Sequence, residues 1–141
     1  DLWRSPYKRN QSIRGFFRAA SNPQVKNNVM TGYLDAGLSF AGLSPRRPND
    51  EFGLAVAWGN ISPAVNNQIK QYNQYYSENA PLPTSESVFE VTYLAPIDSW
   101  WSLPPFFQYI LNPGAGTANP SAPNQKIPNA TIAGIRMAIN F

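Results

Sequence analysis

Carboxylates are the main side chains in this sequence that could carry acid–base chemistry, because its 141 residues include neither histidine nor cysteine. Serine–histidine and cysteine–histidine nucleophiles are therefore excluded, together with disulfides and cysteine-ligated metals. The pair Glu86 and Glu90 is the best candidate for a two-carboxylate glycosidase. Its spacing of four residues at the start of a predicted strand gives this interpretation little support. We predict no enzyme activity, no catalytic residue, no cofactor and no metal site.

The composition is unusual for a soluble domain. Charged residues make up 13% of the sequence and aromatic residues another 13%, whereas soluble domains carry about 25% charged residues. No apolar run reaches the roughly 18 residues that a membrane-spanning helix needs. The sequence thus has few charges for a soluble protein but no membrane-spanning helix. Strands in which every second residue faces lipid account for both features, which favours a transmembrane β-barrel. The net charge of +3 comes from scattered lysines and arginines, so we predict no nucleic-acid partner.

Alternation of apolar and polar residues, bounded by clusters of Pro, Gly, Asn and Asp, recurs along the chain and predicts an all-β protein. The six predicted strands are 12–20, 29–43, 51–62, 87–96, 101–112 and 130–141. No stretch longer than about ten residues is expected to keep helical spacing. The short predicted connections are 44–50 and 97–100, and the long polar ones are 63–86 and 113–129. Long loops on one side are typical of outer-membrane barrels, although 21–28 on that side is short.

Charges share the face opposite to the large apolar residues within each predicted strand. One strand, for example, sets Phe52, Leu54, Val56 and Trp58 against Gly53, Ala55, Ala57 and Gly59. The strands of a soluble sandwich show the same alternation, so the pattern alone leaves both architectures open. Aromatic residues near the strand ends favour the membrane, where such residues mark the interfaces: Trp58, Tyr93, Trp100, Trp101 and Tyr109.

Several segments, in order along nearly the whole chain, carry a family resemblance. The most specific is Phe89-Glu90-Val91-Thr92-Tyr93, followed by Trp100 or Trp101, Leu103, Pro105, Phe107-Gln108-Tyr109-Ile110 and Asn112-Pro113-Gly114. The others are Leu2-Trp3-Arg4, Phe16-Phe17-Arg18-Ala19, Gly32 to Leu38, Phe52 to Ala57 and Gly134 to Phe141. Together they resemble the C-terminal third or so of the carbohydrate-selective porin (OprB) family. Similar proteins usually carry an acidic residue where this sequence has Phe106.

The resemblance implies a transmembrane antiparallel β-barrel of roughly 16 strands around a water-filled channel. Residues 1–141 would form the C-terminal segment of this single domain and supply roughly its last six strands. The implied function is passive, carbohydrate-selective diffusion of sugars across the bacterial outer membrane into the periplasm. The implied partners are sugars, outer-membrane lipid and lipopolysaccharide, the barrel assembly machinery and the N-terminal strands of the same barrel. The resemblance leaves open whether the protein forms a homo-oligomer.

The candidate residues of the channel lumen are Arg14, Arg18, Tyr33, Asp35, Glu90, Gln108 and Arg136. Their polar groups could exchange hydrogen bonds with sugar hydroxyls, and Tyr33 and Phe16 could stack on a pyranose ring. For each residue the alternative role is to brace the barrel wall through cross-strand pairs. The terminal Phe141 resembles the assembly signal of outer-membrane barrels and also suits a lipid-facing anchor.

Two other functions remain open on the sequence. A general or anion-preferring porin would use the same wall without sugar selectivity. A secreted β-sandwich carbohydrate-binding protein would be soluble without detergent and could use Tyr72, Tyr75 and Tyr76 as its sugar platform. In a porin these tyrosines would lie in a long loop, where they could capture sugar at the mouth or pack within the loop.

Overall fold

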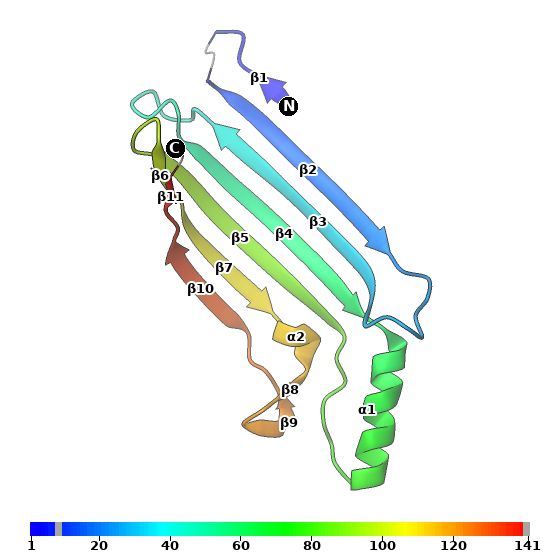
Figure 1. Cartoon of the computed structure of the whole chain (residues 1–141). Helices are drawn as coiled ribbons and strands as arrows, with labels where there is room; N and C mark the ends of the chain where they lie inside the picture. The colour runs from blue at the N-terminus through cyan, green and yellow to red at the C-terminus, as the bar shows by residue number, and fades with distance from the viewer. Residues whose placement is uncertain (8–9, 140–141) are drawn as a thin grey trace.

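The computed structural model describes residues 1–7 and 10–139, whose long strands form one twisted antiparallel sheet (Figure 1). Six long strands pair in chain order: β2 (Ser12–Ser21), β3 (Met30–Ala41), β4 (Glu51–Ile61), β5 (Ser85–Pro96), β7 (Pro105–Leu111) and β10 (Ala130–Ile135). Their positions confirm the six predicted strands. Three short strands extend the sheet: β1 (Trp3–Arg4) beside β2, β6 (Trp101–Leu103) beside β5, and β11 (Ala138–Ile139) beside β6.

Two of the predicted strands are interrupted. Predicted strand 101–112 divides into β6 and β7 at Pro104, because proline has no N–H for the ladder. Predicted strand 130–141 divides into β10 and β11 beside it, and Asn140 and Phe141 lie outside the described residues. The backbone N–H of Arg136 still donates to the Pro104 carbonyl at 3.1 Å. The two interruptions therefore face each other, and the pairing of the last strands continues across them.

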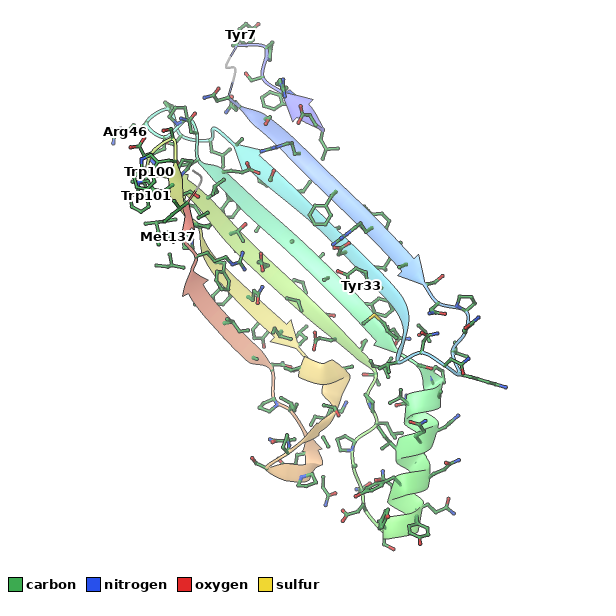
Figure 2. The ribbon with its side chains drawn as sticks, viewed as in Figure 1. Tyr7, Tyr33, Arg46, Trp100, Trp101 and Met137 are labelled. Atoms are coloured by element: carbon green, nitrogen blue, oxygen red, sulfur yellow. The ribbon has the colours of Figure 1, made fainter. Side chains whose placement is uncertain are left out.

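Connections of different length gather at opposite ends of the sheet. At one end, here called the turn end, lie the short connections 42–50 and 97–100. The opposite loop end carries α1 (Pro63–Tyr76), α2 (Pro113–Gly116) and the hairpin of β8 (Ala118–Asn119) and β9 (Ala122–Lys126) (Figure 1). Trp100 and Trp101 lie at the turn end with their rings 5.9 Å apart (Figure 2). The predicted separation of short and long connections is confirmed.

Helix α1 replaces part of the loop predicted over 63–86. The Ser62 hydroxyl accepts a hydrogen bond from the Ala64 N–H at 3.2 Å, and Pro63 occupies the first turn. The helix has 14 residues, so the expectation of no helical stretch beyond about ten residues is wrong here. Val65, Ile69 and Tyr72 recur at helical spacing, but the amide-rich composition hides this pattern. No helix in the described part of the chain is long and apolar enough to cross a membrane.

The start of α1 is tied to the loop end of the sheet, and its far end is tied to the segment that returns to β5. Ser62 is fully buried; its hydroxyl donates to the Val25 carbonyl, and its N–H donates to the Val29 carbonyl at 2.8 Å. At the far end, the Asn73 side chain exchanges hydrogen bonds of 2.8 and 3.0 Å with the backbone of Ala80. These contacts fix the helix and its return segment as one unit.

The described residues form a single layer with almost no apolar interior. Leaving proline and glycine aside, Ala115 is the one buried apolar residue in ranges 1–7 and 10–139. Leu54 and Ile135 remain 42% and 73% exposed. A two-layer sandwich would bury these residues between its sheets, so this architecture contradicts the soluble sandwich.

A polar cluster joins the short connection 42–50 to the end of β5 at the turn end. The Asp50 carboxylate accepts a hydrogen bond from Arg47 Nε at 2.8 Å and another from the Tyr93 hydroxyl. Arg47 Nη2 also donates to the Pro96 carbonyl at 3.3 Å. The hydrogen bond from Arg47 lowers the pKa of Asp50 below its ordinary value, and the Tyr93 bond adds to this against the opposing effect of burial.

Acid is expected to weaken this polar cluster around Asp50. Because the pKa of Asp50 is lower in the folded than in the unfolded chain, its stabilisation is present above about pH 4 and is lost as pH falls through the folded pKa. Arg47→Gln should lower the thermal unfolding midpoint of the full-length protein at neutral pH and flatten its decline in acid. Circular dichroism in detergent measures both quantities. Arg46→Gln, at an exposed position of the same connection, is the matched control; equal acid slopes in wild type and Arg47→Gln would contradict the expectation.

Candidate lumen wall

The strand register gathers most of the predicted lumen residues on one face of the sheet. Residues directly opposite each other in antiparallel strands point their side chains to the same side. Three transverse rows define this mixed face: Arg14–Ser39–Gly53–Thr92–Phe106–Gly134, Phe16–Gly37–Ala55–Glu90–Gln108–Ile132 and Arg18–Asp35–Ala57–Val88–Ile110–Ala130. Tyr33, two residues before Asp35, also belongs to it. Six of the seven predicted lumen residues therefore share this face.

The opposite, apolar face carries the large hydrophobic side chains that alternate with those rows. Its exposed members include Phe17, Leu38, Leu54, Val56, Phe89, Val91 and Phe107. Charged side chains are absent from the register positions between Ile13 and Ser21 on β2 and between Phe52 and Trp58 on β4 that belong to this face. The face is therefore suited to contact with hydrocarbon and poorly suited to water.

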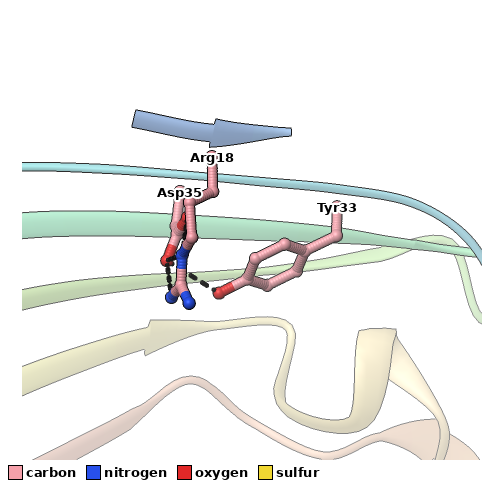
Figure 3. A network of polar contacts seen from close by, with 3 residues as sticks. All are labelled: Arg18, Tyr33 and Asp35. Carbon is pink, nitrogen blue, oxygen red and sulfur yellow. Dashed lines mark hydrogen bonds and ion pairs between the residues drawn. The ribbon is translucent and has the colours of Figure 1, made fainter. Parts of the chain in front are cut away.

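Arg18, Asp35 and Tyr33 form the most connected polar group of the mixed face (Figure 3). Arg18 Nε lies 3.0 and 3.1 Å from the two Asp35 carboxylate oxygens, and the Tyr33 hydroxyl donates to the same carboxylate at 3.1 Å. Arg18 and Asp35 are direct cross-strand neighbours on β2 and β3. Asp35 is 7% exposed whereas the Arg18 side chain is 70% exposed. The carboxylate therefore anchors a guanidinium that remains accessible to solvent.

A second ion pair spans three strands. Arg14 of β2 reaches across β3 to Glu51 of β4, with 2.5 Å between Nη2 and Oε2. The Arg14 side chain can cross β3 because the β3 residues beneath it are small: Ser39 opposite Arg14, and Ala41 opposite Glu51. The pair holds positive and negative groups side by side near the turn end of the wall.

Glu90 has an amide partner in place of a cation. It lies directly opposite Gln108 in the pairing of β5 and β7, and Gln108 Nε2 donates to its carboxylate. No described cation forms an ion pair with Glu90 in residues 1–7 and 10–139. The Glu90–Gln108 pair therefore keeps a net negative charge and free acceptor positions.

Two aromatic rings of the mixed face lie over glycines of the neighbouring strand. A Cβ atom added to Gly37 would meet Phe16 Cε1 at 2.5 Å, and one added to Gly134 would meet two Phe106 carbons at 2.8 Å. The missing side chains thus allow both rings to lie close to the sheet. The Arg136 guanidinium stands over the Phe106 ring at 4.2 Å from its centroid, which brings this residue to the mixed face as well.

A shallow hollow of about 410 Å³ opens among these groups. Its polar lining includes Arg14, Glu51, Glu90 and Thr92, and the Phe16 ring forms one apolar side. Gly53 and Ala55 line it too and keep it open, because their side chains are small. The hollow offers hydrogen-bond donors, acceptors and a ring to a small polar solute.

The sequence did not identify Glu51, Thr92 or Phe106 as wall residues. Glu51 and Thr92 could have been found, because Glu51 shares the alternate positions of its strand with Gly53 and Ala55, and Thr92 lies two residues after Glu90. Phe141, the predicted assembly signal, lies outside the described residues. Tyr72, Tyr75 and Tyr76 are exposed on α1, away from the wall, and contact one another with ring centroids 4.7 and 4.8 Å apart.

The chemistry open to the mixed face is recognition by weak polar contacts. The described residues hold no group of three or more metal-ligating side chains. Glu86, half of the glycosidase candidate, accepts a hydrogen bond from the Gly114 N–H at 2.6 Å, and Glu90 is bonded to Gln108. The two carboxylates therefore have separate hydrogen-bond partners.

The model of the carbohydrate-selective porin family OprB matches residues 1–141. The chain belongs to the OprB family. Porins of this family are channels of the bacterial outer membrane, which confirms the predicted localisation and the family predicted by resemblance. The mixed and apolar faces therefore belong to a porin sheet.

Two relatives support the assignment. Porin B of Pseudomonas aeruginosa is 26% identical over 121 residues, which cover 81% of this chain and 25% of that porin. The high-pH structure of Pseudomonas putida OprB aligns with a TM-score of 0.81 at 24% identity, over 94% of this chain and 31% of that one. At this identity the second match shows the barrel fold alone. The chain spans about a quarter of the length of the curated relative.

Removing the acceptor of the Arg18 network is expected to destabilise the full-length porin. Asp35→Asn would leave Arg18 without its carboxylate and should lower the free energy of unfolding modestly, because water can hydrate the exposed Arg18 side chain. In a double-mutant cycle with Arg18→Gln, the two effects should be less than additive, because each substitution removes the same ion pair. Equilibrium urea unfolding in lipid vesicles measures the free energies. Strictly additive effects of the two substitutions would show that the pair does not brace the wall.

Proposed function

We propose that residues 1–141 form the C-terminal segment of a single outer-membrane β-barrel through which sugars diffuse passively into the periplasm. The observation that carries this proposal is the separation of charge by the register. The charged side chains of the long strands lie on one face, and large exposed apolar side chains dominate the other. In a closed barrel these become the water-filled lumen and the lipid contact.

The remaining N-terminal strands of the same barrel are the first proposed partner. On its outer edge β2 meets two residues of β1, and β10 has no described neighbour on its far edge. In hydrocarbon each unpaired backbone group would cost several kcal/mol. Roughly ten further strands would close a barrel of about 16 strands. The other proposed partners are outer-membrane lipid, lipopolysaccharide and the barrel assembly machinery, which would recognise Phe141. A homo-oligomeric contact would use the apolar face.

The proposed lumen residues act by weak contacts and not by catalysis. The Arg14–Glu51 pair, the Arg18–Asp35–Tyr33 network and the Glu90–Gln108 pair alternate donors with acceptors along the wall. Sugar hydroxyls are both donors and acceptors, so each group offers them a partner. Each contact must stay weak, because a tightly bound solute would block the channel.

Phe16 provides the sharpest test of sugar recognition. Its ring is half exposed on the mixed face, whereas the next residue, Phe17, points to the apolar face. With the full-length porin in planar bilayers, we expect glucose or maltose to reduce the conductance reversibly. Phe16→Ala should raise the sugar concentration for half-maximal block by roughly threefold to tenfold, as expected from losing on the order of 1 kcal/mol of contact.

Phe17→Ala is the matched control, since it removes the same ring from the lipid-facing side. It should leave the sugar block unchanged. If no sugar reduces the conductance of the wild-type porin, the carbohydrate assignment fails and a general or anion-preferring porin takes its place. Equal effects of both substitutions would contradict the assignment of the faces.

A further inference from the structure

The arginines of the mixed face differ in how their charge is balanced. Arg14 is paired with Glu51, and Arg18 with Asp35. Arg136 forms no ion pair with any carboxylate in residues 1–7 and 10–139; its partner is the Phe106 ring. A ring attracts a cation through its quadrupole but leaves its net charge in place. Arg136 therefore contributes an uncompensated positive charge to this part of the wall.

The structure holds Arg136 in place without a carboxylate. The Phe106 ring is confined over Gly134, where any Cβ would meet it at 2.8 Å. The Arg136 N–H donates to the Pro104 carbonyl at 3.1 Å, which fixes the backbone below the side chain. The guanidinium covers the ring at 4.2 Å. Because its N–H donors lie in the plane of the guanidinium, stacking on one flat side leaves their edges accessible.

We propose that Arg136, stacked on Phe106, is an anion-attracting point near the turn end of the lumen, which discriminates permeating solutes by charge. The fitting ligand is a small anion or the carboxylate of an acidic solute, because the guanidinium fork matches such groups with two parallel hydrogen bonds. This inference rests on the proposed function only in placing the mixed face in a conducting channel. It does not depend on sugar recognition.

Reversal potentials of the full-length porin in a KCl gradient across a planar bilayer test the inference. Arg136→Gln should lower the permeability ratio of chloride to potassium by roughly twofold to fivefold, because a fixed charge sets the local concentration of permeating ions. Phe106→Glu should shift the ratio in the same direction, since the new carboxylate would pair with Arg136. Phe106→Leu keeps every charge and should leave the ratio near the wild-type value.

Two further variants act as controls for the charge itself. Glu90→Gln removes an uncompensated negative charge from the same face and should move the ratio in the opposite direction. Arg46→Gln removes an exposed positive charge from the connection 42–50, outside the wall, and should have little effect (Figure 2). The migration of unheated samples in gel electrophoresis verifies that every variant forms a folded barrel.

Unchanged reversal potentials in both Arg136→Gln and Phe106→Glu would overturn the inference. An equal shift in Arg46→Gln would also overturn it, because the effect would then belong to overall charge. The failure of the proposed function looks different. If sugars do not reduce the conductance but Arg136→Gln still shifts the ratio, the carbohydrate assignment falls and the anion-attracting point stands.

Discussion

The obligation to pair every backbone N–H and C=O group in hydrocarbon governs the rest of this structure. From β2 to β10, the six long strands satisfy this requirement by hydrogen-bonding to their neighbours along the sheet. Extended backbone then imposes a period of two, so every residue is assigned to water or lipid by its position. The edges of β2 and β10 are where the obligation is unmet within the segment. In the proposed barrel, strands outside residues 1–141 would pair with these two edges.

The mixed face combines charge with small residues because both are needed for an open wall. Ser39 and Ala41 have small side chains, and Arg14 can therefore cross β3 to reach Glu51. Gly37 and Gly134 similarly let rings rest against the sheet. Ion pairs between strands add little stability where water reaches them. Their larger effect is to hold long side chains against the wall, so that they do not extend freely into the channel.

The sequence was sufficient for the strands and faces because both depend on local alternation. The sequence was insufficient to predict which side chains contact each other across the strands. Arg14 meets Glu51, two strands away, only through the combined register of two strand pairs, which no single segment encodes. The break at Pro104 was readable from proline's missing N–H, yet the surrounding alternation suggested one strand. Helix α1 was obscured by its amides, although Ser62 and Pro63 are a strong signal for a helix start.

Phe106 illustrates how a neighbour can fix the position of a charged side chain and leave its charge unchanged. Its ring holds the Arg136 guanidinium in position. A carboxylate would fix the guanidinium and neutralise it together. The ring fixes it through stacking on one flat side, and the planar N–H donors stay available to a solute. Gly134 completes the arrangement, because a side chain there would displace the ring and with it the arginine. Position and charge are therefore controlled by different residues at this point of the wall.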